Sequence, residues 1–190
     1  MSFFDESKNV GLLLIIIAAL DIIFTLIAVF AFDGYKDMAL WKKIVMIVGV
    51  LITSGLYLLL GLDIQNGSCR LQIGEFFNDV VSKFGVLLAI TAATGIINII
   101  DGLALVFYNP VSGIMNIVIG VLMLVMAYLM VSGGKEANQV VWVILLILYI
   151  LMLIGSVFLC LVLIGIPMLL LSIMLLVFLL SPEVKSKMGM

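Results

Sequence analysis

The chain has 190 residues, of which 66% are hydrophobic and 11% are charged, and its formal net charge is −2. A soluble domain carries about 25% charged residues, so this composition excludes a water-soluble globular protein and predicts an integral membrane protein whose main partner is the lipid bilayer. The slightly acidic charge argues against a nucleic-acid partner, which would require a basic patch.

Four apolar segments are long enough to cross a ~30 Å hydrocarbon core, which takes roughly 20 helical residues. They are residues 10–32, 44–62, 84–108 and 111–131. The first is too long for the apolar part of a signal peptide and follows an acidic lead, so we expect it to be a membrane span.

One ten-residue pattern occurs twice along the chain. Gly-Val-Leu, five further residues and Tyr-Leu occupy residues 49–58 and again residues 120–129. Each copy lies in the second of two apolar segments. The pattern therefore predicts a tandem repeat of paired transmembrane helices.

A fifth apolar segment, residues 140–180, contains no charged residue. As one helix it would be about 60 Å long, twice the thickness of the core, so we expect two spans joined by a tight turn. If Gly165 is the third counterpart of Gly49 and Gly120, the turn falls at Gly155 and Ser156. Pro167 would then kink the sixth span. A turn at residues 165–167 is the alternative, but it leaves a short last span.

These segments predict an all-α, polytopic membrane protein with six transmembrane helices. The helices form three tandem parallel hairpins, at about residues 10–62, 84–131 and 140–180, within a single membrane domain of residues 1–190. Parallel repeats imply a pseudo-symmetry axis along the membrane normal.

Positive charges beside the spans predict the orientation. With six spans, six Lys or Arg residues fall on one side and three on the other, which places both termini in the cytoplasm of a multi-pass plasma or inner membrane protein. The larger group is Lys8, Arg70, Lys83, Lys135, Lys185 and Lys187. Trp142, Tyr57 and Tyr128 are expected to approach the same face as interfacial anchors.

Residues 63–83 form the predicted cytoplasmic loop between the first two hairpins. Within it, residues 74–83 place their apolar side chains on one helical face and their polar side chains on the other. This pattern indicates an amphipathic helix, either a docking surface at the membrane interface or a lead-in to the third span.

Two acids lie inside predicted spans, Asp21 and Asp101. An acid near the bilayer centre costs ~2.5–3.5 kcal/mol, so it normally faces the bundle interior or water. Asp101 continues a stripe of polar and small residues at helical steps, which the following span answers with Gly113, Asn116 and Gly120. The remaining members of the stripe are Thr91, Thr94, Gly95, Asn98 and Gly102.

Two interpretations of these residues stay open. The functional one is a polar path in which Asp21 and Asp101 exchange protons or bind cations, together with Asn98, Asn116, Thr91 and Thr94. The structural one is close helix approach at the small residues, with the amides and acids hydrogen-bonding one another. On the Gly155 alignment Leu146 occupies the position of Asp101, so the fold does not require the acid.

Catalytic, cofactor and metal sites are not predicted. The chain has no histidine, which removes the commonest general base and transition-metal ligand. Neither Cys69 nor Cys160 has the spacing of a metal site. We therefore expect no catalytic residue, no cofactor and no enzyme activity.

The second predicted hairpin carries a family resemblance. A glycine, an apolar stretch, an Asn-Pro turn and a glycine in the next helix occur as Gly102, Asn109, Pro110 and Gly120. This arrangement resembles the HdeD-like family of small six-span acid-resistance membrane proteins. The resemblance implies a stress-related or accessory membrane protein and assigns no catalytic residue.

The sequence therefore predicts a non-enzymatic membrane protein that supports a stress response or a larger membrane assembly. Its protein partners would be a second copy or other membrane proteins. The alternative is a small transporter or channel with a polar path through Asp21, Asp101, Asn98 and Asn116. Side chains that are dry, mutually bonded and closed to both faces would exclude that alternative.

Overall fold

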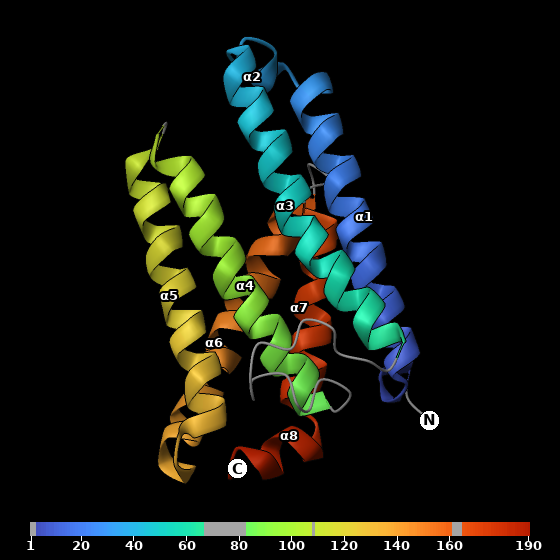
Figure 1. The fold of residues 1–190 in the computed structure, drawn as a ribbon, viewed down its shortest axis with the longest axis vertical. Helices are drawn as coiled ribbons and strands as arrows, with labels where there is room; N and C mark the ends of the chain where they lie inside the picture. The colour runs from blue at the N-terminus through green and yellow to red at the C-terminus, as the bar shows by residue number, and fades with distance from the viewer. Residues whose placement is uncertain (1–2, 67–82, 108, 161–164) are drawn as a thin grey trace.

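A computed structural model describes residues 3–66, 83–107, 109–160 and 165–190, and these residues form helices and no strand (Figure 1). The longer helices are α1 (Ser7–Ala31), α3 (Leu40–Gln65), α4 (Lys83–Val106), α5 (Pro110–Ser132), α6 (Lys135–Leu159) and α7 (Gly165–Leu179). The shorter ones are η1 (Phe3–Asp5), α2 (Asp33–Lys36) and α8 (Pro182–Lys187). The predicted amphipathic helix at residues 74–83 lies, except for its last residue, outside the described residues.

Five of the helices, α1 and α3 to α6, are long and apolar enough to cross a bilayer, which indicates a multi-pass membrane protein. The first four predicted segments are confirmed as long apolar helices, and their ends differ from the predicted ends by at most four residues. Helix α7 is apolar but has 15 residues, so it is only about 22 Å long. Many large apolar side chains are exposed along these helices, as expected where a protein faces lipid.

The predicted turn at Gly155 and Ser156 is wrong. Helix α6 continues through both residues, and the Ser156 hydroxyl donates to the carbonyl of Leu153 at 2.8 Å. An apolar environment favours an unbroken helix because every backbone polar group must be satisfied within it. The alternative turn at residues 165–167 is not found either, because these residues are helical in α7, and residues 161–164 lie outside the described residues.

The predicted third copy of the repeat, aligned on Gly165, is not found, because it required the turn at Gly155 and Ser156. Gly165 is the first residue of α7, whereas Gly49 and Gly120 lie well inside α3 and α5. Pro167 is the third residue of the described part of α7, and residues 161–164 before it lie outside the described residues, so the kink stays a prediction. The alignment of Leu146 with Asp101 loses its basis.

The long helices pack mainly in consecutive pairs, α1 with α3, α4 with α5 and α6 with α7. Each pair also contacts the next one, through α3 and α4, α5 and α6, and α7 and α1, so the helices form a closed ring. Helix α4 also contacts α7 across this ring. Residues 84–92 of α4 are all buried, which makes the first half of α4 the centre of the bundle.

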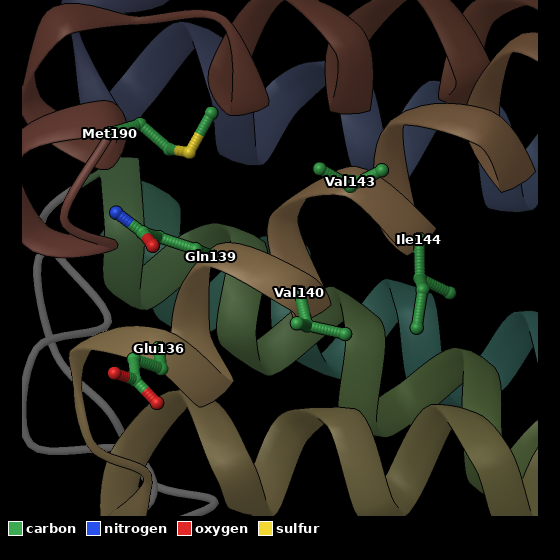
Figure 2. Close-up of a pocket in the computed structure, with 6 residues that line it drawn as sticks. All are labelled: Glu136, Gln139, Val140, Val143, Ile144 and Met190. Atoms are coloured by element: carbon green, nitrogen blue, oxygen red, sulfur yellow. The ribbon is translucent and has the colours of Figure 1, made fainter.

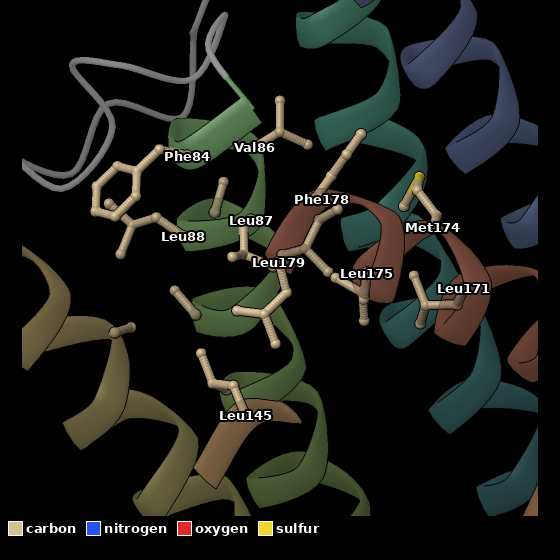
Figure 3. Close-up of a cluster of buried hydrophobic side chains, with 14 of the residues drawn as sticks. Phe84, Val86, Leu87, Leu88, Leu145, Leu171, Met174, Leu175, Phe178 and Leu179 are labelled. Carbon is tan, nitrogen blue, oxygen red and sulfur yellow. The ribbon is translucent and has the colours of Figure 1, made fainter. Parts of the chain in front are cut away.

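A cluster of apolar side chains fills the space between α4, α6 and α7. Figure 3 shows Leu87 of α4, Leu145 of α6 and Leu175 of α7 converging there, and each is at most 1% exposed. Within a bilayer such packing is stabilised by van der Waals contact, because lipid tails are as apolar as leucine. This cluster holds α7 in place although α7 is short.

Both described ends of the chain lie at the same end of the bundle. In Figure 1, η1, the start of α4, the α5–α6 turn and α8 are at the lower end, while α2 and the α4–α5 turn are at the upper end. The ring of Phe4 also packs edge-on against Phe178 near the end of α7, with centroids 5.8 Å apart.

The C-terminal helix α8 docks under the bundle, which the sequence did not indicate. Its Val184 side chain is fully buried, and the Glu183 carboxylate accepts a hydrogen bond from the backbone N–H of Phe84 at 3.4 Å. The first N–H groups of a helix have no partner within it, so Glu183 caps α4 from a distant part of the chain. Gln139 of α6 donates to the carbonyl of Gly189 at 2.6 Å, which fixes the tail further.

Candidate functional site

Asp21 lies near the middle of α1 and points toward α3. The hydroxyl of Ser54 on α3 donates to Oδ2 of Asp21 at 2.8 Å, and Ser54 is fully buried. This bond joins α1 and α3 and gives the Asp21 carboxyl group one hydrogen-bond partner inside the bundle.

Asp101 lies on α4 and, like Asp21, faces α3. A Cβ on Gly49 would stand 3.9 Å from Oδ1 of Asp101, an ordinary van der Waals distance, so the Asp101 carboxyl group lies next to Gly49 of α3. Among the described residues, the Asp101 carboxyl group has no hydrogen-bond partner. Asp101 and Asp21 both line a cavity of about 250 Å³, together with Thr25, Thr53 and Asn116.

A second, larger cavity of about 480 Å³ shares part of its lining with the first. Asp21 and Asn116 line both cavities, so the two spaces meet at these side chains. The walls of the larger cavity come from α1, α3, α4, α5, α6 and α7 and are mostly apolar. Its other polar side chains are Tyr57, Thr94, Asn98 and Tyr149.

Two buried tyrosines hydrogen-bond to threonines of α4. The hydroxyls of Tyr57 and Thr94 share a hydrogen bond of 2.8 Å, and those of Tyr149 and Thr91 share one of 3.0 Å. Thr91 also lies 2.7 Å from the carbonyl of Leu87, to which it donates, so Tyr149 is the donor in its pair. The expectation that Tyr57 is an interfacial anchor is wrong, because its ring is buried within the bundle.

The predicted stripe on α4 divides between two faces. A Cβ on Gly95 would stand 2.9 Å from the carbonyl oxygen of Gly120, and one on Gly102 would stand 2.7 Å from that of Gly113. These glycines therefore form the close contact between α4 and α5, as the structural interpretation expects. Close packing thus explains the small residues of the stripe.

The polar members of the stripe do not bond one another. Asn98 donates to the carbonyl of Thr94 in its own helix at 2.9 Å. Within the described part of the chain, no hydrogen bond joins Asn98 or Asn116 to Asp21 or Asp101. Mutual hydrogen bonding of the amides and acids, which the structural interpretation required, does not occur there.

The charge of the acids has no fixed partner in the spans. No Lys or Arg lies within residues 10–32, 44–62, 84–108, 111–131 or 140–180. A carboxyl group in such a cavity either holds a proton or faces a mobile cation. Among the residues that the structure describes, no group of three His, Cys, Asp or Glu side chains is placed to hold a metal ion.

A separate hollow lies on α6 near the C-terminal tail. Figure 2 shows Met190 above the first turns of α6, with Glu136, Gln139 and Val140 along the helix. It contains none of the predicted site residues, and its two polar side chains do not converge on one point in this view. We therefore assign the candidate site to the two adjoining cavities.

The sequence predicted Asp21, Asp101, Asn98, Asn116, Thr91 and Thr94 as the polar residues, and all of them lie at or next to these cavities. Ser54 and Tyr149 were missed. A serine or tyrosine in an apolar segment has no distinctive spacing, and only the packing of α3 and α6 against the acids and threonines reveals them.

Comparisons with protein-family models, with curated proteins and with solved structures found no match.

Proposed function

We propose that the chain is a small non-enzymatic transporter or channel that passes protons or small cations through its polar centre. The observation that carries this proposal is that two cavities meet at Asp21 and Asn116, with Asp101 facing one of them. The path would run past Asp101, Asn116, Asp21 and Asn98. Acids without a fixed counter-ion in a membrane bundle mark such paths in general.

The proposed arrangement in the membrane has six crossings. Helix α7 would be the sixth, and the three pairs α1–α3, α4–α5 and α6–α7 would be tandem hairpins of a single membrane domain. The shared location of η1 and α8 at one end supports an even number of crossings. The excess of Lys and Arg at that end favours the cytoplasm of a plasma or inner membrane, which labelling of Cys69 from the cytoplasmic side tests.

The direct test is proton entry into liposomes that contain the purified chain and a trapped pH indicator. Under an inward proton gradient with compensated charge, we expect the native chain to acidify the interior faster than protein-free liposomes do. Asp21→Asn with Asp101→Asn should return the rate to the protein-free value, since neither site then exchanges a proton.

Glu136→Gln is the matched control, because it removes an exposed acid outside both cavities. It should keep the native rate. A native rate equal to the protein-free rate for protons and for sodium, or an unchanged rate in the double variant, would refute the proposed transport.

The stress-related or accessory role implied by the HdeD-like resemblance stays a second prediction. The Asn-Pro turn on which it rests does form, since the Asn109 side chain caps α5 by accepting from the backbone N–H of Ser112 at 3.3 Å. A defined partner or oligomer that co-purifies in mild detergent, together with absent flux, would favour this role.

A further inference from the structure

The larger cavity has the size and wall chemistry of a small-molecule site. Its volume of about 480 Å³ lies within the ~300–1,000 Å³ typical of ligand pockets, which are mostly apolar with a few convergent polar groups. The apolar part of the wall includes Ile97, Ile119 and Leu171. An apolar body of moderate size would therefore fit better than a hydrated ion.

Most polar groups around this cavity are already satisfied. The hydroxyls of Tyr57 and Tyr149 bond to threonines, and the Asn98 amide bonds to a backbone carbonyl. Asp21 differs, because its Oδ2 accepts one bond from Ser54 and its Oδ1 has no partner among the described residues. A carboxylate accepts about four hydrogen bonds, so Asp21 retains most of its capacity.

The same cavity offers soft contacts for a positive charge. Tyr57 and Tyr149 bring aromatic rings to its wall, and Met123, Met152 and Met168 bring polarizable, adaptable side chains. Aromatic faces attract cations, and methionines fit ligands of irregular shape. A hard metal ion would instead require about six oxygen ligands, which this wall does not provide.

We propose that the larger cavity binds a hydrophobic organic cation of single positive charge, with the Asp21 carboxylate as its counter-charge. One acid in an otherwise apolar wall matches one positive charge on an apolar body. An anion of the same shape would face Asp21 without any cationic side chain to offset it. This proposal goes beyond the transport of protons and small cations proposed above, because it adds a binding site for an organic cation at Asp21.

The test compares tetraphenylphosphonium with tetraphenylborate, two ions of nearly the same shape and opposite charge. Equilibrium dialysis against the purified full chain in detergent, with protein-free micelles as the blank, measures the saturable binding of each. We expect saturable binding of tetraphenylphosphonium and none of tetraphenylborate. Asp21→Asn should weaken the binding at least roughly 30-fold, as loss of one partner of a desolvated charge pair does.

Glu136→Gln is the matched control, because it removes an exposed acid that lines neither of the two adjoining cavities. It should leave tetraphenylphosphonium binding within about twofold of native, since well-separated sites act nearly independently. Equal binding of the two ions, or an Asp21→Asn variant that elutes as the native chain and binds as tightly, would overturn the proposal.

The two proposals fail differently. Proton or sodium flux without saturable tetraphenylphosphonium binding would overturn the organic-cation site and leave transport of small cations standing. Charge-selective binding that depends on Asp21, in a chain that moves neither protons nor sodium across liposomes, would support the site and overturn the transport of small cations.

Discussion

Gly120→Ala is expected to lower the free energy of unfolding by about 1–3 kcal/mol, the usual effect of an added methyl group in a packed contact. The new Cβ would stand 2.6 Å from the carbonyl oxygen of Gly95 and 2.7 Å from Cγ1 of Ile99. Because the oxygen belongs to a backbone, it can move away only if α4 and α5 separate. Thermal or denaturant unfolding in detergent, followed by circular dichroism, measures the loss.

Gly155→Ala provides the matched control, because a Cβ there meets no atom within 4 Å. Alanine is also the better helix former, so this variant should be at least as stable as the native chain. Equal stability of the two variants would mean that α4 and α5 are not held together at Gly95 and Gly120.

Gly49→Leu is expected to stop proton flux without removing either acid. Gly49 lines the smaller cavity, and a Cβ added to it would stand 3.9 Å from Oδ1 of Asp101. A leucine there would fill much of a cavity of about 250 Å³ and separate Asp101 from Asn116. The flux should fall to that of protein-free liposomes, while the unfolding transition stays close to native because no backbone lies within 4 Å.

Gly55→Leu on the same helix is the control, since a Cβ on Gly55 has open space around it. It should keep the native flux. If Gly49→Leu conducts as the native chain does, the smaller cavity does not belong to the path.

Most of the fold follows from hydropathy, because length and apolar composition determine which segments can cross a bilayer. The end of α6 at Leu159 could not be predicted in this way. Gly155 and Ser156 resemble a turn in sequence, but in apolar surroundings the continuous helix satisfies more backbone groups. The docking of Glu183 on the start of α4 depends on tertiary contact and leaves no local pattern.

The acids and amides of the candidate site could be predicted from the sequence. The residues of other helices that contact them could not. Asp21 and Asp101 stand out because acids are rare in apolar segments. Their neighbours Ser54, Tyr57 and Tyr149 come from other helices, so no spacing along one helix reveals them.

The two copies of the repeated pattern lie in different environments, which the sequence alone does not show. Gly120 packs against the backbone of α4, whereas Gly49 opens onto a cavity. Tyr57 is 9% exposed and bonded to Thr94, whereas Tyr128 is 56% exposed. The glycine of the pattern thus packs against a helix in α5 and lines a cavity in α3, while the tyrosine is exposed in α5 and buried in α3.

The most direct measurement is whether water and ions reach the place where the cavities meet. Asn116→Cys, in a chain with Cys69→Ser and Cys160→Ser, would be treated in liposomes with a cationic, membrane-impermeant methanethiosulfonate. A thiol reacts as its thiolate, which forms only where water reaches it. We predict that Asn116→Cys is modified, whereas Met115→Cys on the neighbouring exposed, lipid-facing surface is not. Equal resistance of both cysteines would show that the centre is dry and contradict a conducting path.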